Sequence, residues 1–69
     1  MTKGTVISFD SARGFGFIAP EDGSADVFVH ISAVEQSGLG YLSEGQKIEF
    51  DSQPDERGAK AVNLFAVED

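Results

Sequence analysis

The chain has 69 residues, no cysteine, and twelve acidic against five basic residues, which gives a formal net charge of −7. A chain this short buries only about 60% of its unfolded surface, so we expect one domain, residues 1–69, with a thin core. Disulfides and thiolate metal sites are excluded, and no apolar run reaches the ~20 residues of a membrane span or the pattern of a secretory signal, so a soluble cytoplasmic protein is expected.

Five short runs rich in valine, isoleucine and phenylalanine predict β-strands at residues 4–10, 14–19, 26–30, 46–51 and 59–67. Turn-forming residues are found between these runs at 20–24, 43–46 and 54–58. Helical periodicity is absent over any window of a dozen residues, and only 32–36, with Ser32 as its N-cap, is compatible with a single helical turn. The fold class is therefore predicted to be all-β.

A sheet of five strands has two edges that invite aggregation, and closing the sheet into a barrel removes them. We therefore predict a small five-stranded antiparallel barrel, with a long connection at 31–45 between the third and fourth strands. The glycine-rich part of this connection, residues 37–41, is expected to be mobile. The residues predicted to fill the barrel are Val6, Ile18, Val27, Val29, Ile48, Phe50, Val62 and Leu64.

The second and third predicted strands carry aromatic residues at alternate positions. Side chains alternate between the two faces of a strand, so Phe15 and Phe17 share one face, as do Phe28 and His30 on the next strand. Only one face of each strand can enter the core, and Ile18 with the two valines forms an aliphatic set of suitable size. Exposed rings forgo about 1.5–3 kcal/mol each relative to burial, and such a patch usually marks a binding surface. Rings about 6.8 Å apart suit successive unstacked bases.

Each of these residues also has an ordinary interpretation. A phenylalanine taken alone is more often a core residue than a binding residue, and a lone histidine is more often a surface residue. The strand alternation outweighs this expectation, because the rings and the valines cannot both be buried. Beside three rings, His30 is a candidate for stacking and hydrogen bonding to a base. Arg13 precedes the run, where a phosphate contact or a stacked guanidinium would be useful.

Two segments resemble the nucleic-acid-binding motifs of the cold-shock domain family. Residues 13–18, RGFGFI, resemble its RNP1 motif, and residues 27–31, VFVHI, resemble RNP2; the likeness runs from about residue 3 to 64. An RRM, which shares an RNP1 motif, would need two long helices that this sequence lacks. The resemblance implies an OB-fold barrel that binds single-stranded RNA or DNA as a monomer, with pyrimidine-rich strands favoured. It also implies a role as an RNA chaperone in the stress response, with possible regulation of transcription or translation. By resemblance, the binding residues are Phe9, Arg13, Phe15, Phe17, Phe28 and His30, with Asp26 as a base contact.

The sequence departs from the family pattern at several aromatic positions. Residues 7–10 are Ile-Ser-Phe-Asp, where the family usually has lysine, tryptophan, phenylalanine and asparagine. Ile31 and Leu39 also replace aromatic residues, and Tyr41 offers a substitute two positions after Leu39. Losing one to three stacking partners at about 1–3 kcal/mol each predicts binding weaker by one to several orders of magnitude than in typical members. The further candidate contacts are Ser8, Ile31, Tyr41, Arg57 and Lys60.

Two other classes of function compete with nucleic-acid binding. The same barrel could use its aromatic face as a protein-interaction surface, with nucleic-acid binding weakened or lost, since a fold does not fix a function. An enzyme is disfavoured, because one histidine and no cysteine leave no nucleophile and base pair, and no glycine-rich loop precedes a helix. The acids Glu21, Asp22 and Asp26 lack the regular ligand positions of a calcium-binding hand. No catalytic residue, cofactor or metal site is predicted.

Overall fold

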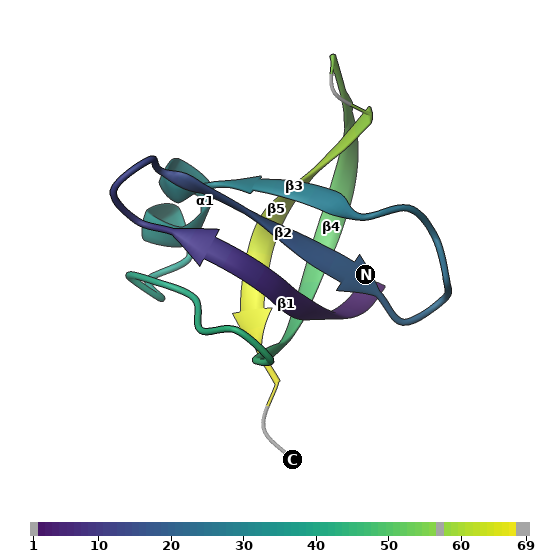
Figure 1. Cartoon of the computed structure of the whole chain (residues 1–69), viewed down its shortest axis with the longest axis horizontal. Coiled ribbons are helices and arrows are strands. Elements are labelled where there is room, and N and C mark those ends of the chain that lie inside the picture. The colour runs from purple at the N-terminus through teal and green to yellow at the C-terminus, as the bar shows by residue number, and fades with distance from the viewer. Residues whose placement is uncertain (1, 57, 68–69) are drawn as a thin grey trace.

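The computed structural model describes residues 2–56 and 58–67 and is built almost entirely from strands (Figure 1). This confirms the predicted all-β class. The elements, in chain order, are β1 (Thr2–Asp10), β2 (Phe15–Pro20), β3 (Val27–His30), α1 (Ile31–Gln36), β4 (Lys47–Asp55) and β5 (Gly58–Ala66). Pro54 and Asp55 belong to β4 rather than to the predicted turn at 54–58. Within the described residues, no helix is long and apolar enough to cross a membrane.

The strands form a closed barrel in the order β1-β2-β3-β5-β4. Four of the neighbouring pairs are antiparallel, but β3 and β5 run parallel, with Phe28 opposite Lys60. The predicted five-stranded barrel is therefore confirmed, and it is antiparallel except at this closing contact. The reason is the connection through α1 and β4, which returns the chain to β3 in the same direction.

The barrel interior contains the predicted apolar core residues with one exception. Alternation fails in β5, because Asn63 adopts a positive φ of 53° and the register against β4 shifts in this region. Ala61 and Leu64 are consequently buried, whereas Val62, predicted to be a core residue, is only half-buried. The core consists of Val6, Ile18, Val27, Val29, Val34, Leu42, Ile48, Phe50, Ala61 and Leu64.

Helix α1 follows β3 without a loop and covers one end of the barrel (Figure 1). His30, with an extended backbone, is its N-cap and accepts a hydrogen bond from the backbone N–H of Ser32, so the predicted cap at Ser32 is wrong. Val34 lies on the face of α1 that packs against the core and has no exposed surface. Leu42, from the connection that follows, is also buried there. These two residues complete the core from a segment with no strand pattern.

The hydroxyl of Ser37 joins the end of α1 to the irregular part of β5. Ser37 Oγ donates to the carbonyl of Ala33 at 2.9 Å and accepts from the backbone N–H of Leu64 at 2.9 Å. Leu64 follows the positive-φ residue Asn63, where the strand is irregular. A side chain therefore satisfies a backbone donor in a residue that is 1% exposed.

Gly16 marks the closest approach of β2 to β1. A Cβ at Gly16 would overlap the carbonyl oxygen of Ser8 and lie 2.9 Å from the Cα of Phe9. Glycine at this position therefore permits a close approach of the two backbones. Gly14, with φ of +82°, belongs to the preceding turn, so β2 begins at Phe15 and not at residue 14 as predicted.

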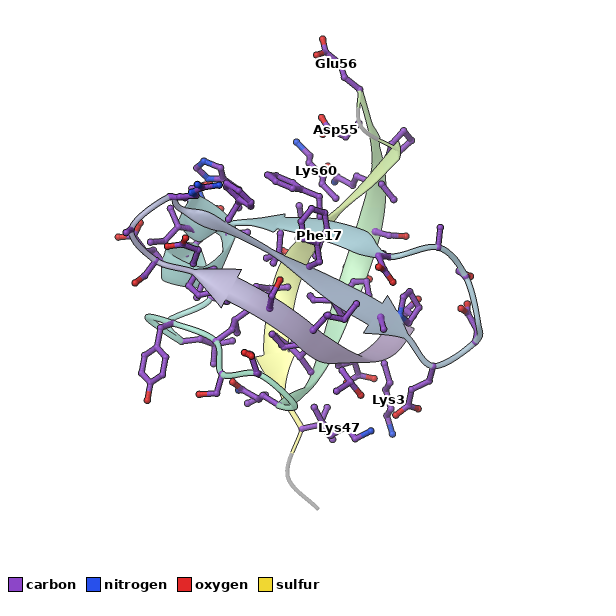
Figure 2. The ribbon with its side chains drawn as sticks, viewed as in Figure 1. Lys3, Phe17, Lys47, Asp55, Glu56 and Lys60 are labelled. Carbon is purple, nitrogen blue, oxygen red and sulfur yellow. The ribbon has the colours of Figure 1, made fainter. Side chains whose placement is uncertain are left out.

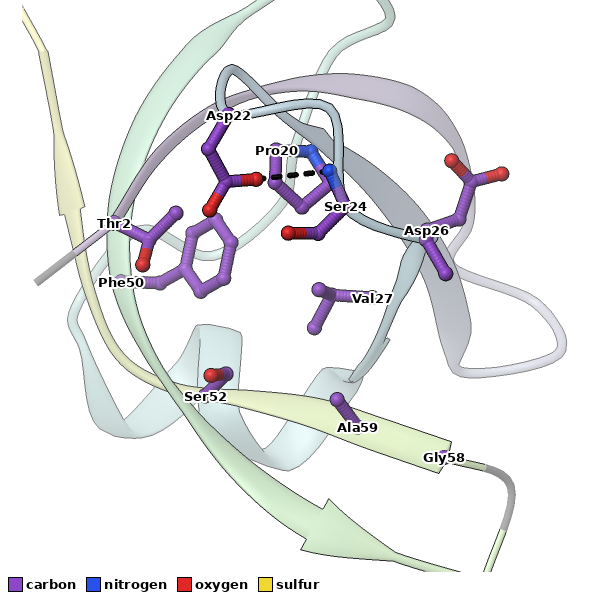
Figure 3. A pocket seen from close by; sticks show the side chains of 11 residues that line it. Thr2, Pro20, Asp22, Ser24, Asp26, Val27, Phe50, Ser52, Gly58 and Ala59 are labelled. Carbon is purple, nitrogen blue, oxygen red and sulfur yellow. Dashed lines mark hydrogen bonds between the residues drawn. The ribbon is translucent and has the colours of Figure 1, made fainter.

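The barrel mouth opposite α1 holds a hollow of about 330 Å³ (Figure 3). The loop between β2 and β3 forms part of its rim. In this loop the carboxylate of Asp22 accepts from the backbone N–H of Ser24 at 2.9 Å, and hydrogen bonding from Ser24 lowers the pKa of Asp22. The loop is thus shaped by a local turn rather than by contact with the core.

Candidate nucleic-acid interface

The paired strands β2 and β3 carry four ring side chains on one outer face. Phe15 is opposite His30, and Phe17 is opposite Phe28. Cross-strand partners point to the same side of a sheet, so these four residues share a face, here called the aromatic platform. The residues between them, Val29 among others, are buried. The structure therefore has the predicted alternation, with the rings on the outer face and the aliphatic side chains in the core.

The rings of the aromatic platform contact one another directly. The centroids of Phe15 and Phe28 are 5.9 Å apart with an interplanar angle of 25°, which is a stacked pair. Phe17 meets both edge-on, at 6.3 Å from Phe15 and 6.0 Å from Phe28. Phe17 is the most open of these phenylalanines, with 38% of its surface exposed. The rings surround a shallow hollow of about 350 Å³ that Arg13 and His30 also line.

The imidazole of His30 is held by hydrogen bonds to the first turn of α1. Its Nδ1 accepts from the backbone N–H of Ser32 at 3.1 Å and lies 2.9 Å from the Ser32 hydroxyl. Accepting a backbone hydrogen bond requires a lone pair on Nδ1, so the neutral ring carries its proton on Nε2. The His30 ring lies 6.4 Å from that of Phe28. His30 thus adds a fixed polar group to the platform, with Nε2–H available as a donor.

Two basic residues lie beside the platform. Arg13 is in the turn between β1 and β2 and remains largely exposed, 3.8 Å from the carboxylate of Asp10. Lys60 on β5 is the cross-strand partner of Phe28, and Figure 2 shows it on the same side of the barrel as Phe17. The net charge of −7 therefore does not exclude phosphate contacts at this face, because exposed charges beyond a Debye length of about 8 Å are screened.

The other two lysines of the described residues lie away from the platform, on the opposite side of the molecule (Figure 2). Lys47 donates to the hydroxyl of Thr5 at 2.9 Å and lies 3.8 Å from the carboxylate of Glu21. Lys3 lines the same small hollow as Lys47 and Glu21. These lysines are therefore poorly placed to contact a strand that crosses the platform.

Three further predicted contacts, Ser8 and Phe9 on β1 and Ile31 at the start of α1, lie outside the four residues of the platform. Ser8 is exposed and is the cross-strand partner of Phe17, so it extends the same face. Phe9 is opposite Gly16 and packs against the core, away from the rings. Ile31 is half-buried beside Gly14. Of the three, only Ser8 continues the platform surface.

The remaining predicted contacts are dispersed. Asp26 is exposed at the barrel mouth and does not line the hollow over the rings (Figure 3). Tyr41 is 65% exposed in the connection after α1 and does not line that hollow either. Arg57 lies outside the described residues. The structure thus brings together Arg13, Phe15, Phe17, Phe28, His30 and Lys60.

One residue that the sequence reasoning did not single out organises the edge of the platform. Asp10 Oδ1 accepts from the backbone N–H groups of Ala12 and Arg13 at 3.0 and 3.1 Å. The backbone N–H of Gly14 donates to the carbonyl of Asp10, and that of Ile31 donates to the carbonyl of Gly14. An aspartate at the end of a strand is a turn signal that could have indicated this role, because its carboxylate can accept from the backbone N–H two residues on.

Comparison with known proteins accounts for this arrangement. Residues 2–67 match the model of the 'Cold-shock' DNA-binding domain. The chain belongs to the cold-shock domain family. It is 52% identical over 65 residues to the cold shock-like protein CspC of Shigella flexneri, covering 94% of each chain. The CspC of Escherichia coli K12 is 51% identical over the same length and coverage. The probable cold shock protein y4cH of Sinorhizobium fredii is 57% identical over 68 residues, covering 96% of this chain and 99% of that protein.

This cold-shock domain protein is therefore a nucleic-acid-binding protein with the OB-type barrel of its family. The family is one of binding domains and not of enzymes. Among the described residues, no group of three or more histidine, aspartate and glutamate side chains is arranged to hold a metal ion. The chemistry available at the platform is stacking, hydrogen bonding and phosphate contact, none of which needs a catalytic group.

Proposed function

We propose that this protein is cytoplasmic and that it binds single-stranded RNA or DNA as a monomer, by stacking unstacked bases on the aromatic platform. The observation that carries the proposal is the set of three outward phenylalanine rings with centroids 5.9–6.3 Å apart. Each stacked base contributes about 1–3 kcal/mol, and stacking tolerates any base because every base has a π-face. Pyrimidine-rich strands are favoured because separating their neighbouring bases from one another costs the least free energy.

The polar groups around the rings have distinct roles in this proposal. Arg13 and Lys60 contact phosphates on either side of the stacked bases. His30 stacks at the edge of the platform and donates from Nε2 to a base. A protein that holds unstacked bases shifts the equilibrium between RNA hairpins and single strands by mass action, which makes it an RNA chaperone without chemistry. Regulation of transcription or translation would follow from the same shift.

We further propose that the footprint is short for the family. Ser8, the neighbour of Phe17 on β1, brings a hydroxyl and no ring to the platform. Ile31 and Leu39 are aliphatic and half-buried. The described rings that can stack a base on the outer face are therefore concentrated on β2 and β3.

The test is the affinity for a fluorescently labelled hexathymidine, measured by anisotropy at physiological salt. Phe17→Ala should weaken binding about 5- to 150-fold, the equivalent of one stacked base at 1–3 kcal/mol. Phe17 is partly exposed, so its loss should leave the fold intact. The matched control is Phe65→Ala, which removes another exposed ring, 55% open to solvent against 38% for Phe17, from β5, where it does not line the hollow over the rings. This control should bind hexathymidine as the parent protein does.

Four results would count against the proposal or a part of it. Equal losses of affinity in Phe17→Ala and Phe65→Ala would mean that the platform is not the binding site. No binding at millimolar strand would exclude nucleic acid as the partner. A nanomolar dissociation constant would contradict the short footprint alone. If Phe17→Ala instead changed self-association in sedimentation, the aromatic platform would be a protein-interaction surface.

A further inference from the structure

A second hollow lies next to the platform, between α1 and β5. Its volume is about 250 Å³, and it shares His30 with the hollow over the rings. We call it the α1–β5 hollow. Its polar lining is His30, Ser32, Gln36 and Lys60, and the small side chains of Ala33 and Ala61 also line it. The His30 imidazole, fixed by Ser32, therefore stands between two adjoining concave surfaces.

The polar groups of this hollow match those that a nucleotide presents. Lys60 supplies a cation, and the amide of Gln36 supplies a donor and an acceptor side by side. Within the described part of the chain, neither side chain has a hydrogen-bond or ion-pair partner. Both groups are therefore available to a ligand without breaking a contact to another described residue.

The position of Lys60 connects the hollow to the platform. Lys60 is the cross-strand partner of Phe28 and lines the α1–β5 hollow together with His30. Lys60 is therefore next to both the platform and the α1–β5 hollow, and His30 lines the hollow over the rings as well as the α1–β5 hollow.

We propose that the α1–β5 hollow binds one further nucleotide of the same strand, with its phosphate on Lys60 and its base edge on Gln36. The proposal rests on the proposed function, since the strand must first occupy the platform. The volume is below the 300–1,000 Å³ of sites for drug-sized ligands, which suits a single nucleotide. The alanine side chains leave room for a base. Glutamine pairs with adenine through two hydrogen bonds, so adenine is the base favoured at this position.

The experiment compares labelled hexathymidine with heptamers that carry one added adenosine or one added thymidine at either end. The readout is the ratio of heptamer to hexamer affinity for each protein, so that changes in overall charge cancel. The parent protein should bind one adenosine-extended heptamer about threefold to tenfold more tightly than the hexamer, as expected for one or two net hydrogen bonds. The same heptamer with thymidine should gain less.

Gln36→Ala should abolish this gain while leaving the affinity for hexathymidine unchanged. The matched control is Glu35→Ala, the neighbouring exposed residue of α1, which does not line the hollow. It should keep the parent ratio. The proposal for the α1–β5 hollow would be wrong if the parent protein bound the hexamer but gained no affinity from either extension. It would also be wrong if the gain persisted in Gln36→Ala. In both cases the proposal for the platform would be unaffected. If the parent protein did not bind the hexamer, both proposals would be wrong.

Discussion

Replacing Ser37 with alanine tests how the irregular part of β5 is stabilised. The Ser37 hydroxyl accepts from the backbone N–H of Leu64 and donates to the carbonyl of Ala33. In Ser37→Ala the carbonyl of Ala33 keeps its bond from the backbone N–H of residue 37, at 3.1 Å. Leu64, only 1% exposed, loses the partner of its N–H and gains none from solvent. The variant therefore leaves one buried donor unpaired.

An unpaired buried donor costs about 1–3 kcal/mol. Small domains are stable by only about 5–15 kcal/mol, so the loss is a substantial fraction of the total. For a domain of this length each kcal/mol lowers Tm by about 4–8 °C, which predicts a fall of between about 4 and 24 °C. The aromatic platform is untouched, so affinity for single strands below the transition should not change.

Urea unfolding followed by circular dichroism measures the change in the free energy of unfolding. The control is Ser43→Ala, because Ser43 is exposed and its hydrogen bond to Gln46 uses its backbone N–H. Amide hydrogen exchange adds a local readout, since the Leu64 amide should exchange faster in Ser37→Ala and not in Ser43→Ala. A stability within about 0.5 kcal/mol of the control, the range of ordinary surface substitutions, would refute the role given to the Ser37 hydroxyl.

Two further predictions follow from the glycine contact and from the charges. Gly16→Ala places a Cβ against the backbone of Ser8 and should lower the free energy of unfolding by about 3 kcal/mol or more. The control Gly23→Ala has open space around its Cβ but a φ of +83°, and should lower the free energy of unfolding by about 1–2 kcal/mol. Both values are measured by urea unfolding, and equal losses would contradict the close approach at Gly16. With phosphate contacts from Arg13 and Lys60 alone, the logarithm of affinity against the logarithm of salt concentration should have a slope of about −1.4. A titration over salt that gives a slope steeper than about −3 would require phosphate contacts elsewhere.

The predictable part of the fold rests on strict alternation. In β2 and β3, alternation separated Phe17 and Phe28 from Val29 without ambiguity, so the platform geometry could be derived from the sequence. The strands themselves were also identified, because valine, isoleucine and phenylalanine runs are bounded by clear turn residues. The binding roles of these side chains stay a prediction until an affinity is measured.

The missed features arise where alternation is interrupted. Asn63 takes a positive φ, which moves Val62 out of the core and Ala61 into it. In β1 the register against β2 jumps between Val6 and Ser8, leaving Ile7 45% exposed. Neither interruption has a sequence signal as strong as glycine or proline in a strand. They are set by the closure of the barrel, which is a property of the whole chain.

The closure itself has a kinetic consequence. Phe28 and Lys60 are the described Cα pair that joins β3 to β5, and they come from distant parts of the sequence. A bound nucleic-acid strand that stacks a base on Phe28 and places a phosphate on Lys60 would link β3 to β5. These are the two neighbouring strands that chain connectivity constrains least. Saturating single-stranded ligand should therefore slow unfolding more than it speeds folding, because this link exists only once the barrel has closed.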